Sequence, residues 1–479
     1  MWNFYSPISG VVERIYGWDD YLVEWIANTA GLVYTIVVCF ASMLVDARGA
    51  RVVVVLAGFG VLACGALRLV PVALADHEYL VFVSMVFNGL AAAPIGLCPP
   101  GVSAAWFPAN ERTLATAIAT TSNYLGQAVG FFLGPAMVPD NHRTNRTNRT
   151  NSTNRAGRPD ISSGGGMGGG MGIGGGGAGS AMATSIHGVM ASGGALGALG
   201  ALGHHPVRNN HTTDTDYLNL QRLYWVEAGM GAAVFLILLI YWPEKPPVPP
   251  TTSAAQPRTN FMDGFRELVT HRRFWTVCLS FGVPTGVFGG WIVVLDLNLQ
   301  SLQIEEIDQN VASLIGTLQI VAGCVVGILV SALNDRCFKR QLKRAILAMY
   351  AVAFLCFTAF AVLCQMWKSG ALPFNMAALY VVTILGGMMI NGTIPLFYEL
   401  GMETVFPIPE SGAAGLMMLV QNALQSAFLA VPTPHGSSAM WMNWTLAACI
   451  PVFMLWMATF TERYPRADMD ALHVSKADK

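Results

Sequence analysis

A series of long apolar stretches separated by short polar loops constrains this chain more than any other feature. A helix that crosses a bilayer needs about 20 mostly apolar residues. Hydrophobic residues make up 53% of the 479 residues and charged residues 11%, whereas soluble domains carry about 25% charged residues. About eleven stretches are long enough to span: 21–45, 52–75, 79–98, 113–138, 222–242, 274–297, 311–333, 345–367, 373–398, 411–432 and 439–461. The sequence therefore predicts an all-α, multi-pass membrane protein in contact with the lipid bilayer.

The charges of the short loops predict the orientation. Basic residues such as Arg48, Arg51 and Arg336 occupy alternate loops, and acidic residues such as Asp19 and Glu305 occupy the others. Basic loops stay in the cytosol. We therefore expect the C-terminus in the cytosol.

Composition divides the chain into six parts. These are a first half at 1–139, a loop at 140–221, a helix at 222–242, a linker at 243–273, a second half at 274–463 and a tail at 464–479. The loop is rich in Asn, Thr and Gly, and such a composition predicts disorder. It contains four acceptor sequons, at Asn145, Asn148, Asn151 and Asn210. Because sequons are glycosylated only outside the cytosol, the loop is expected on the lumenal or outer face. The Pro-rich linker is expected in the cytosol.

Several classes of function are disfavoured by the sequence. The net charge of -1 offers no basic field for nucleic acid. The chain has no metal-ligand cluster, nucleophile elbow or phosphate loop. We therefore expect neither an enzyme nor a cofactor or metal site, and the nine cysteines are interpreted as small buried hydrophobes.

One short pattern occurs twice, at equivalent places in the two halves. Asp46-Ala-Arg48-Gly49-Ala-Arg51 follows the first complete span, and Asp335-Arg336-Cys-Phe-Lys-Arg follows the span at 311–333. The pattern resembles the loop of the major facilitator superfamily that lies between helices 2 and 3 and again between helices 8 and 9. The resemblance implies two six-helix halves, with residues 1–10 as the end of helix 1 and most of that helix missing. We expect each acid to pair with loop cations and latch the halves together.

Further motifs resemble solute carrier family 49, and in particular its member 4 branch. The residues that carry this resemblance are Trp2-Asn3-Phe-Tyr-Ser-Pro7-Ile, Tyr16-Gly17-Trp18, Trp106-Phe107-Pro108 with Glu111-Arg112, Asn123-Tyr124-Leu-Gly126, Gly282 to Trp291 with Leu295-Asp296, Asn391 to Glu399, and Glu403 to Glu410. The resemblance implies a monomeric lysosomal carrier that moves pyridoxine with protons. The sister branch, the feline leukaemia virus subgroup C receptor-related proteins, moves choline and ethanolamine and has been linked to haem. The plasma membrane is the alternative location, because the sorting tail of the family is missing. A non-transporting receptor or scaffold is a further alternative.

Polar residues inside spans are the candidates for binding, because polar groups that face lipid are costly. The expected substrate-binding residues are Trp2, Asn3, Asn123, Tyr124, Gln127, Trp291, Asn391, Asn422 and Gln425. Trp2 falls where the family has a ligand-stacking aromatic, and it could instead be an interfacial anchor. The amides could instead make contacts between helices. Candidates for proton coupling or gating are Glu399, Glu403, Asp296 and Glu227. Glu399 and Glu403 share a helix face, because they are spaced four residues apart.

Overall fold

The computed structural model describes residues 5, 8–18, 20–70, 77–138, 214–241, 246–247, 249–256, 261–300, 302, 304, 309–336, 340–431 and 440–470. Several predicted residues lie outside this part of the chain: Trp2, Asn3, Asn145, Asn148, Asn151 and Asn210. Asp296 lies within a described helix, but its side chain is outside the description.

The described regular structure is helical. The N-terminal half contains α1 (Ser9–Tyr16), α2 (Asp20–Arg48), α3 (Ala50–Arg68), α4 (His77–Trp106), α5 (Arg112–Met137) and α8 (Asp214–Ile240). The linker holds α9 (Thr252–Ala255) and α10 (Phe261–Thr270). The C-terminal half contains α11 (Arg272–Val293), α12 (Leu295–Gln300), α13 (Gln309–Arg336), α14 (Leu342–Lys368), α15 (Met376–Val405), α16 (Glu410–Ala430) and α17 (Met440–Thr459).

The predicted spans are found as long helices. In the described part of the chain, ten helices are long and apolar enough to cross a membrane. The eleventh predicted span is α5, a helix of 26 residues whose Thr, Ser, Asn and Gln side chains lower its mean hydropathy. Some boundaries differ from the prediction: α4 continues to Trp106 instead of ending at residue 98, α15 continues to Val405 instead of 398, and α8 begins at Asp214 instead of residue 222. The early start of α8 is due to packing, because Leu220 and Leu223 lie three residues apart on one helix face and are both buried.

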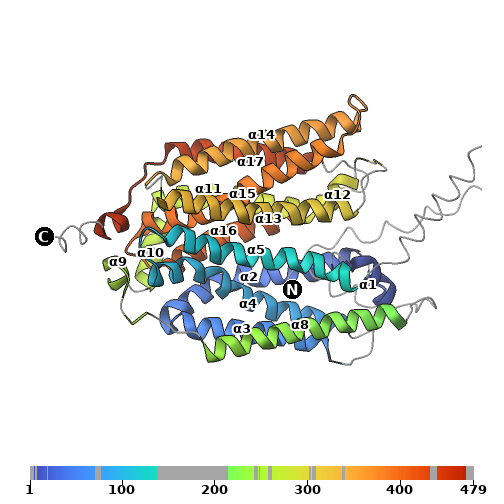
Figure 1. Cartoon of the computed structure of the whole chain (residues 1–479), viewed down its shortest axis with the longest axis horizontal. Coiled ribbons are helices and arrows are strands. Elements are labelled where there is room, and N and C mark those ends of the chain that lie inside the picture. Colours follow the sequence, from blue (N-terminus) through green and yellow to red (C-terminus); the bar gives the residue numbers. More distant parts are fainter. Residues whose placement is uncertain are drawn as a thin grey trace, which may run out of the picture.

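The two halves lie side by side with their long helices along the long axis of the molecule (Figure 1). One end, which we call the linker end, carries α9, α10 and the segment at 460–470 that follows α17 (Figure 1). The opposite end carries α1 and α12, and we call it the loop end (Figure 1). The halves meet along a seam in which α2 packs against α16 and α5 packs against α13.

Glycines set how closely the helices of the C-terminal half approach one another. Gly282, Gly286 and Gly290 form a stripe on α11 that faces α16. A Cβ atom at Gly286 would lie 2.5 Å from the carbonyl oxygen of Gln421. The glycine-rich motif of α11 is therefore a packing surface, since small residues let helices in lipid come into close contact. This close packing also fixes the rotation of α16 about its own axis, and so determines where its polar residues lie.

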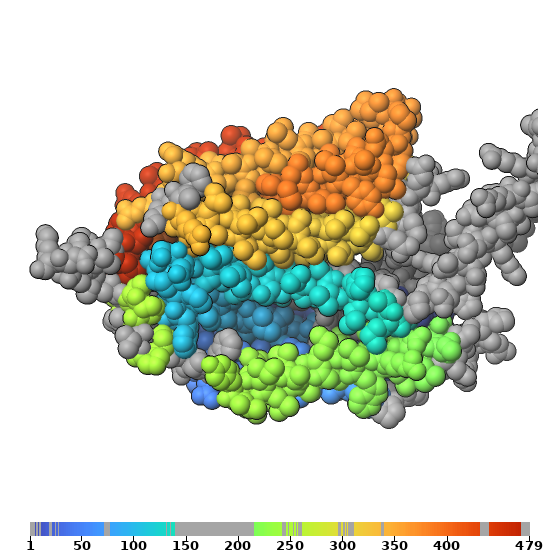
Figure 2. All heavy atoms as spheres, viewed as in Figure 1, coloured from blue at the N-terminus to red at the C-terminus, as the bar shows by residue number. Residues whose placement is uncertain are grey.

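The N-terminal half is the less complete of the two. Among the described residues it has five long helices and the C-terminal half has six. Between α5 and α8 the surface is hollowed, with α4 at the bottom of the hollow (Figure 2). Ideal Cβ atoms at Gly126 and Gly130 of α5 and Gly229 of α8 would meet no heavy atom within 4 Å. These positions of α5 and α8 therefore face open space among the described residues.

Candidate functional site

The middle of the seam holds a cluster of tyrosines contributed by both halves. Tyr34 of α2 and Tyr124 of α5 lie near each other, and both lie near Tyr398 of α15. The side-chain amide of Gln421 on α16 reaches the Tyr124 hydroxyl. We call these four residues the central cluster. Its members come from four helices on both sides of the seam, which is where a carrier of this fold binds its substrate.

Two members of the central cluster carry buried polar atoms that lack a partner. The Tyr398 hydroxyl and the Gln421 Oε1 atom have no hydrogen-bond partner among the described residues. On α13, neither polar atom of the Gln319 amide has a partner among the described residues, and this side chain lies against Gly387 of α15. Leaving such a group unpaired costs about 1–3 kcal/mol. Unpaired polar atoms on the helices that line the seam are typical of a site where a ligand completes the hydrogen bonds.

Two of the predicted substrate residues, Tyr124 and Asn391, lie at this cluster. Tyr124 is a member of the cluster and also lines a narrow crevice between α5, α13 and α15, and Asn391 lines that crevice as well. The crevice is also lined by Thr121 and Cys324, and the Cys324 thiol donates to the Thr121 carbonyl oxygen at 3.4 Å. The crevice therefore crosses from one half to the other at the level of the cluster.

The other predicted substrate residues have different surroundings. Asn422 donates from Nδ2 to the Met418 carbonyl oxygen of its own helix at 2.9 Å, and Gln425 packs over Gly289 of α11. Asn123 is exposed and Gln127 is half-buried. Trp291 is fully buried inside the C-terminal half, where its Nε1 atom donates to Asn443 Oδ1 at 2.8 Å. We therefore leave Trp291 out of the site.

The sequence analysis missed Tyr34, Tyr398, Gln421 and Gln319. Tyr398 directly precedes Glu399 in the motif Asn391 to Glu399, and Gln421 directly precedes Asn422. Both therefore stand next to residues that the sequence did single out. A signal for Tyr34 is Gly96 on α4, where a Cβ atom would lie 2.5 Å from the Tyr34 hydroxyl oxygen. That relation becomes visible only when α2 and α4 are placed together.

At the linker end, the repeated acids bind across the seam in a symmetrical way. Ser411 at the start of α16 donates to Asp46 at the end of α2. The backbone nitrogen of Leu114 at the start of α5 donates to Asp335 at the end of α13, at 2.9 Å. Helix N-termini carry partial positive charge and free N–H groups. The two acids therefore contact helix N-termini of the opposite half instead of the expected loop cations, and their role as a latch stays a prediction. Arg48, Arg51 and Arg336 are exposed, and Gly49 adopts the positive φ of 83° that turns the chain into α3.

The paired glutamates lie in a buried charged cluster at the same end. Glu403 accepts from the backbone nitrogens of Arg466 at 3.2 Å and Ala467 at 3.5 Å. The electrostatic partners of the Arg466 guanidinium are Glu399, Glu410, Glu403 and Asp470. Arg112 at the start of α5 also interacts with Glu399 and Glu403. We call these residues the linker-end charge cluster: Glu399, Glu403, Glu410, Asp470, Arg112 and Arg466. It contains more carboxylates than cations.

The remaining proton candidate, Glu227, lies away from the seam. Its Oε2 atom is 2.5 Å from Nη1 of Arg68, within the N-terminal half. The Arg68 guanidinium also donates to Ser84 Oγ at 3.1 Å and lies 5.3 Å from the centre of the Tyr5 ring. This ion pair joins α3 to α8 inside one half, which favours a structural role.

Comparison with known proteins agrees with the geometry. The family model described as Major Facilitator Superfamily matches residues 1–143. The structure is similar to that of the transporter FucP in the outward conformation, with a TM-score of 0.61 and 11% identity over 96% of each chain. It is also similar to the human organic anion transporter MFSD10, with a TM-score of 0.53 and 13% identity over 95% of this chain and 89% of that one. These similarities show that the chain has the fold of the major facilitator type.

Sequence relatives define the family within that class. The chain is 30% identical over 472 residues to the solute carrier family 49 member 4 homolog of Xenopus laevis, covering 98% of this chain and 89% of the relative. It is 23% identical over 430 residues to the choline/ethanolamine transporter FLVCR1 of Felis catus, covering 87% of this chain and 61% of that protein. The chain belongs to solute carrier family 49.

Proposed function

We propose that this transporter carries pyridoxine together with protons by alternating access. The observation that carries the proposal is the central cluster, in which an unpaired hydroxyl group and an unpaired amide oxygen lie near tyrosine side chains of both halves. Pyridoxine is a flat pyridine ring with several hydroxyl groups. Its ring can stack on tyrosine faces, and its hydroxyl groups can pair with the free atoms of Tyr398 and Gln421.

Choline or ethanolamine is the competing substrate, because the relative FLVCR1 bears their names. The quaternary ammonium group of choline binds to aromatic faces and donates no hydrogen bonds, so choline could pair with the unpaired atoms of the central cluster only through its single hydroxyl group. Ethanolamine has an ammonium group that does donate hydrogen bonds, but it has no ring to stack on tyrosine faces. The chemistry of the cluster therefore favours pyridoxine, which has both a ring and several hydroxyl groups.

The contacts across the seam suggest which state of the cycle this structure represents. Asp46 with Ser411 and Asp335 with Leu114 join the halves at the linker end. At the loop end, a separate core of buried residues is built from the N-terminal half alone. We propose that the linker end faces the cytosol and is closed here, so that the site opens toward the lumenal or outer side. The positive-inside charge pattern supports the same orientation.

Proton coupling is assigned to Glu399 and Glu403 within the linker-end charge cluster. Four carboxylates face the two guanidinium groups of Arg112 and Arg466 there. Burying excess negative charge is unfavourable, so a proton on one glutamate stabilises the closed state. Loss of that proton would favour opening at the linker end. For the cellular setting we propose a glycosylated monomer in the lysosomal membrane, with the plasma membrane as the alternative.

Labelled pyridoxine uptake tests the proposal. Cells that carry the chain at their surface are assayed at acid and neutral outer pH, with excess unlabelled pyridoxine or choline as competitors. We expect uptake that rises in acid, falls with unlabelled pyridoxine and resists choline. Tyr124→Phe should weaken uptake, while the exposed Asn123→Ala serves as the matched control on the same helix. Uptake that changed neither with pH nor with added unlabelled pyridoxine would contradict the proposal. Stronger inhibition of uptake by choline than by pyridoxine would support the alternative substrate.

A further inference from the structure

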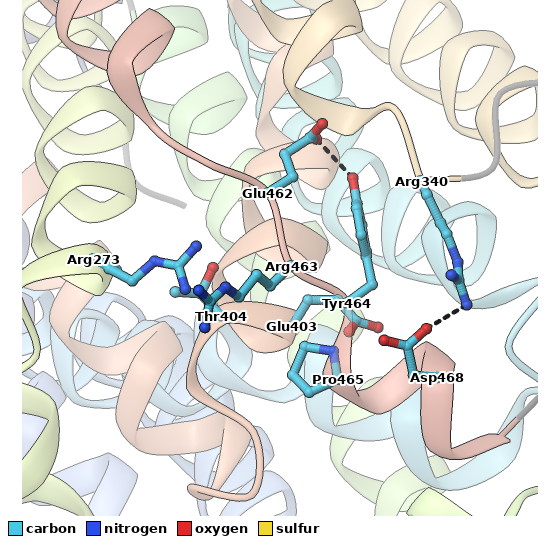
Figure 3. Close-up of a pocket in the computed structure, with 9 residues that line it drawn as sticks. All are labelled: Arg273, Arg340, Glu403, Thr404, Glu462, Arg463, Tyr464, Pro465 and Asp468. Atoms are coloured by element: carbon cyan, nitrogen blue, oxygen red, sulfur yellow. Dashed lines mark hydrogen bonds and ion pairs between the residues drawn. The ribbon is translucent and has the colours of Figure 1, made fainter. Parts of the chain in front are cut away.

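The chain that follows α17 runs back over the linker end of the C-terminal half and is tied to it at several points (Figure 3). The Lys343 Nζ atom donates to the carbonyl oxygens of Ala458 and Phe460 at 2.7 and 2.6 Å. The Lys343 backbone nitrogen donates to Glu462 at 2.6 Å. Arg340 forms an ion pair with Asp468 at 2.6 Å (Figure 3). The segment 460–470 is therefore anchored on the beginning of α14.

The middle of this segment enters the buried linker-end charge cluster. Arg466 is 1% exposed, and its backbone nitrogen is bound by Glu403 of α15 at 3.2 Å. Burial lowers the pKa of Arg466, but the nearby carboxylates of Glu399, Glu410, Glu403 and Asp470 raise it above its ordinary value. Arg466 therefore remains charged and holds the segment to α15.

The end of the segment reaches the other half of the molecule. Asp470 accepts from Nη1 of Arg112 at 3.2 Å, and Arg112 stands at the start of α5. Asp470 also accepts from the backbone nitrogen and from the hydroxyl of Ser253 in the linker, both at 2.8 Å. Arg112 in turn donates to Ser253 Oγ at 2.9 Å and to Thr251 Oγ1 at 2.5 Å. One carboxylate thus joins the C-terminal segment, the linker and the N-terminal half.

We propose that residues 460–470 form a clasp that holds the linker end closed and must release α5 before the transporter can open there. Because the clasp is anchored on α14 and α15, it moves with the C-terminal half when the halves rock apart. The contact that must break is then Asp470 with Arg112. This inference uses only the transporter fold and is independent of the substrate.

A cavity that borders the clasp gives water a route to its charged groups. The cavity, of about 550 Å³, lies between the segment and the ends of α11 and α15, and its lining includes Arg273, Glu403, Tyr464 and Asp468 (Figure 3). Charged groups that separate from one another need water to solvate them. Because this cavity already borders the segment, water can reach the charges as the clasp detaches.

The experiment measures access to the closed seam. Ser42 of α2 is buried against Gly415 of α16 at the linker end, so a cysteine in the Ser42→Cys variant reports opening of that end. Its rate of reaction with a water-soluble maleimide is measured in the purified full chain, with the native cysteines as background. Asp470→Asn in this background should raise the rate about tenfold, since it replaces the charge-assisted hydrogen bond between Asp470 and Arg112 across the seam with a weaker neutral one.

Asp468→Asn is the matched control, because Asp468 lies in the same segment and pairs with Arg340 on an exposed surface. It should leave the labelling rate within about twofold of the parent, since exposed ion pairs contribute little. The exchange Arg112→Asp with Asp470→Arg should return the rate toward the parent value if the contact itself matters. An unchanged rate in Asp470→Asn, in a protein that stays monodisperse, would overturn the clasp. Equal increases in Asp470→Asn and Asp468→Asn would overturn it as well, by indicating general loosening of the segment.

Discussion

The seam between the two halves is polar at its middle and at its linker end, but the polar groups are satisfied very differently at the two places. At the linker end, Asp46, Asp335 and Asp470 each accept hydrogen bonds from the opposite half. In the middle, the Tyr398 hydroxyl and Gln421 Oε1 have no partner among the described residues. Satisfied charges hold one conformational state in place, whereas unpaired groups are ready for a ligand. From this comparison we propose that the linker end controls the conformational state and that the middle of the seam binds substrate.

The largest effect is expected from Arg112→Ala at the linker end. Removing one partner of a buried ion pair costs about 3–5 kcal/mol, because the other charge remains buried. The variant should lower the melting temperature of the purified protein markedly. Arg340→Ala is the control: Arg340 and Asp468 are 51% and 56% exposed, and exposed pairs contribute about 0–1 kcal/mol. Equal melting temperatures for Arg112→Ala and Arg340→Ala would show that the buried contact of the clasp contributes no more to stability than the exposed pair.

The next effect concerns proton coupling. Glu403→Gln keeps an oxygen that can accept from the Arg466 and Ala467 nitrogens but removes the titratable group. We expect uptake that no longer rises in acid, while exchange of substrate at constant pH continues. Uptake at acid and neutral pH measures the first property, and counterflow measures the second. Retention of the acid stimulation in Glu403→Gln and also in Glu399→Gln would exclude both glutamates as the coupling site.

A smaller effect is expected in the middle of the seam. Tyr398→Phe removes a hydroxyl that has no partner, so thermal stability should stay the same or rise slightly. The same change should raise the KM for substrate about tenfold, which corresponds to about 1.4 kcal/mol. Tyr350→Phe is the matched control, since the Tyr350 hydroxyl donates to the Ser280 carbonyl oxygen at 2.8 Å inside the C-terminal half. That variant should lose about 1 kcal/mol of stability with no change in KM. The reverse result would place the binding site elsewhere.

The smallest effect should come from the two repeated acids. Asp46→Asn and Asp335→Asn each weaken one contact with a helix N-terminus, which is worth about 0.5–2 kcal/mol. Both variants should raise maleimide labelling of a cysteine at the linker-end seam by similar amounts, less than Asp470→Asn does. A large difference between them would show that the two sides of the seam do not open together.

Local patterns in the sequence predicted much of the fold. The apolar stretches located the spans because hydropathy acts over one helix at a time. The duplicated Asp46 and Asp335 motifs predicted two related halves, whereas the latch role of these acids stays a prediction. α5 was found as a predicted span although its polar residues reduce its hydropathy. The start of α8 was missed, because its burial depends on neighbours that the sequence does not reveal.

The candidate site depended on contacts between distant parts of the chain. The sequence by itself determined which residues cross the membrane and which acids lie at the helix ends, since both follow from short-range patterns. Only the tertiary structure decided that Tyr34, Tyr124, Tyr398 and Gln421 meet, and that Asp470 reaches Arg112 across 358 positions. In lipid, the rotation of each helix is set by close packing at small residues rather than by hydropathy. Such packing, as between Gly286 and α16, therefore selects which polar side chains face the seam.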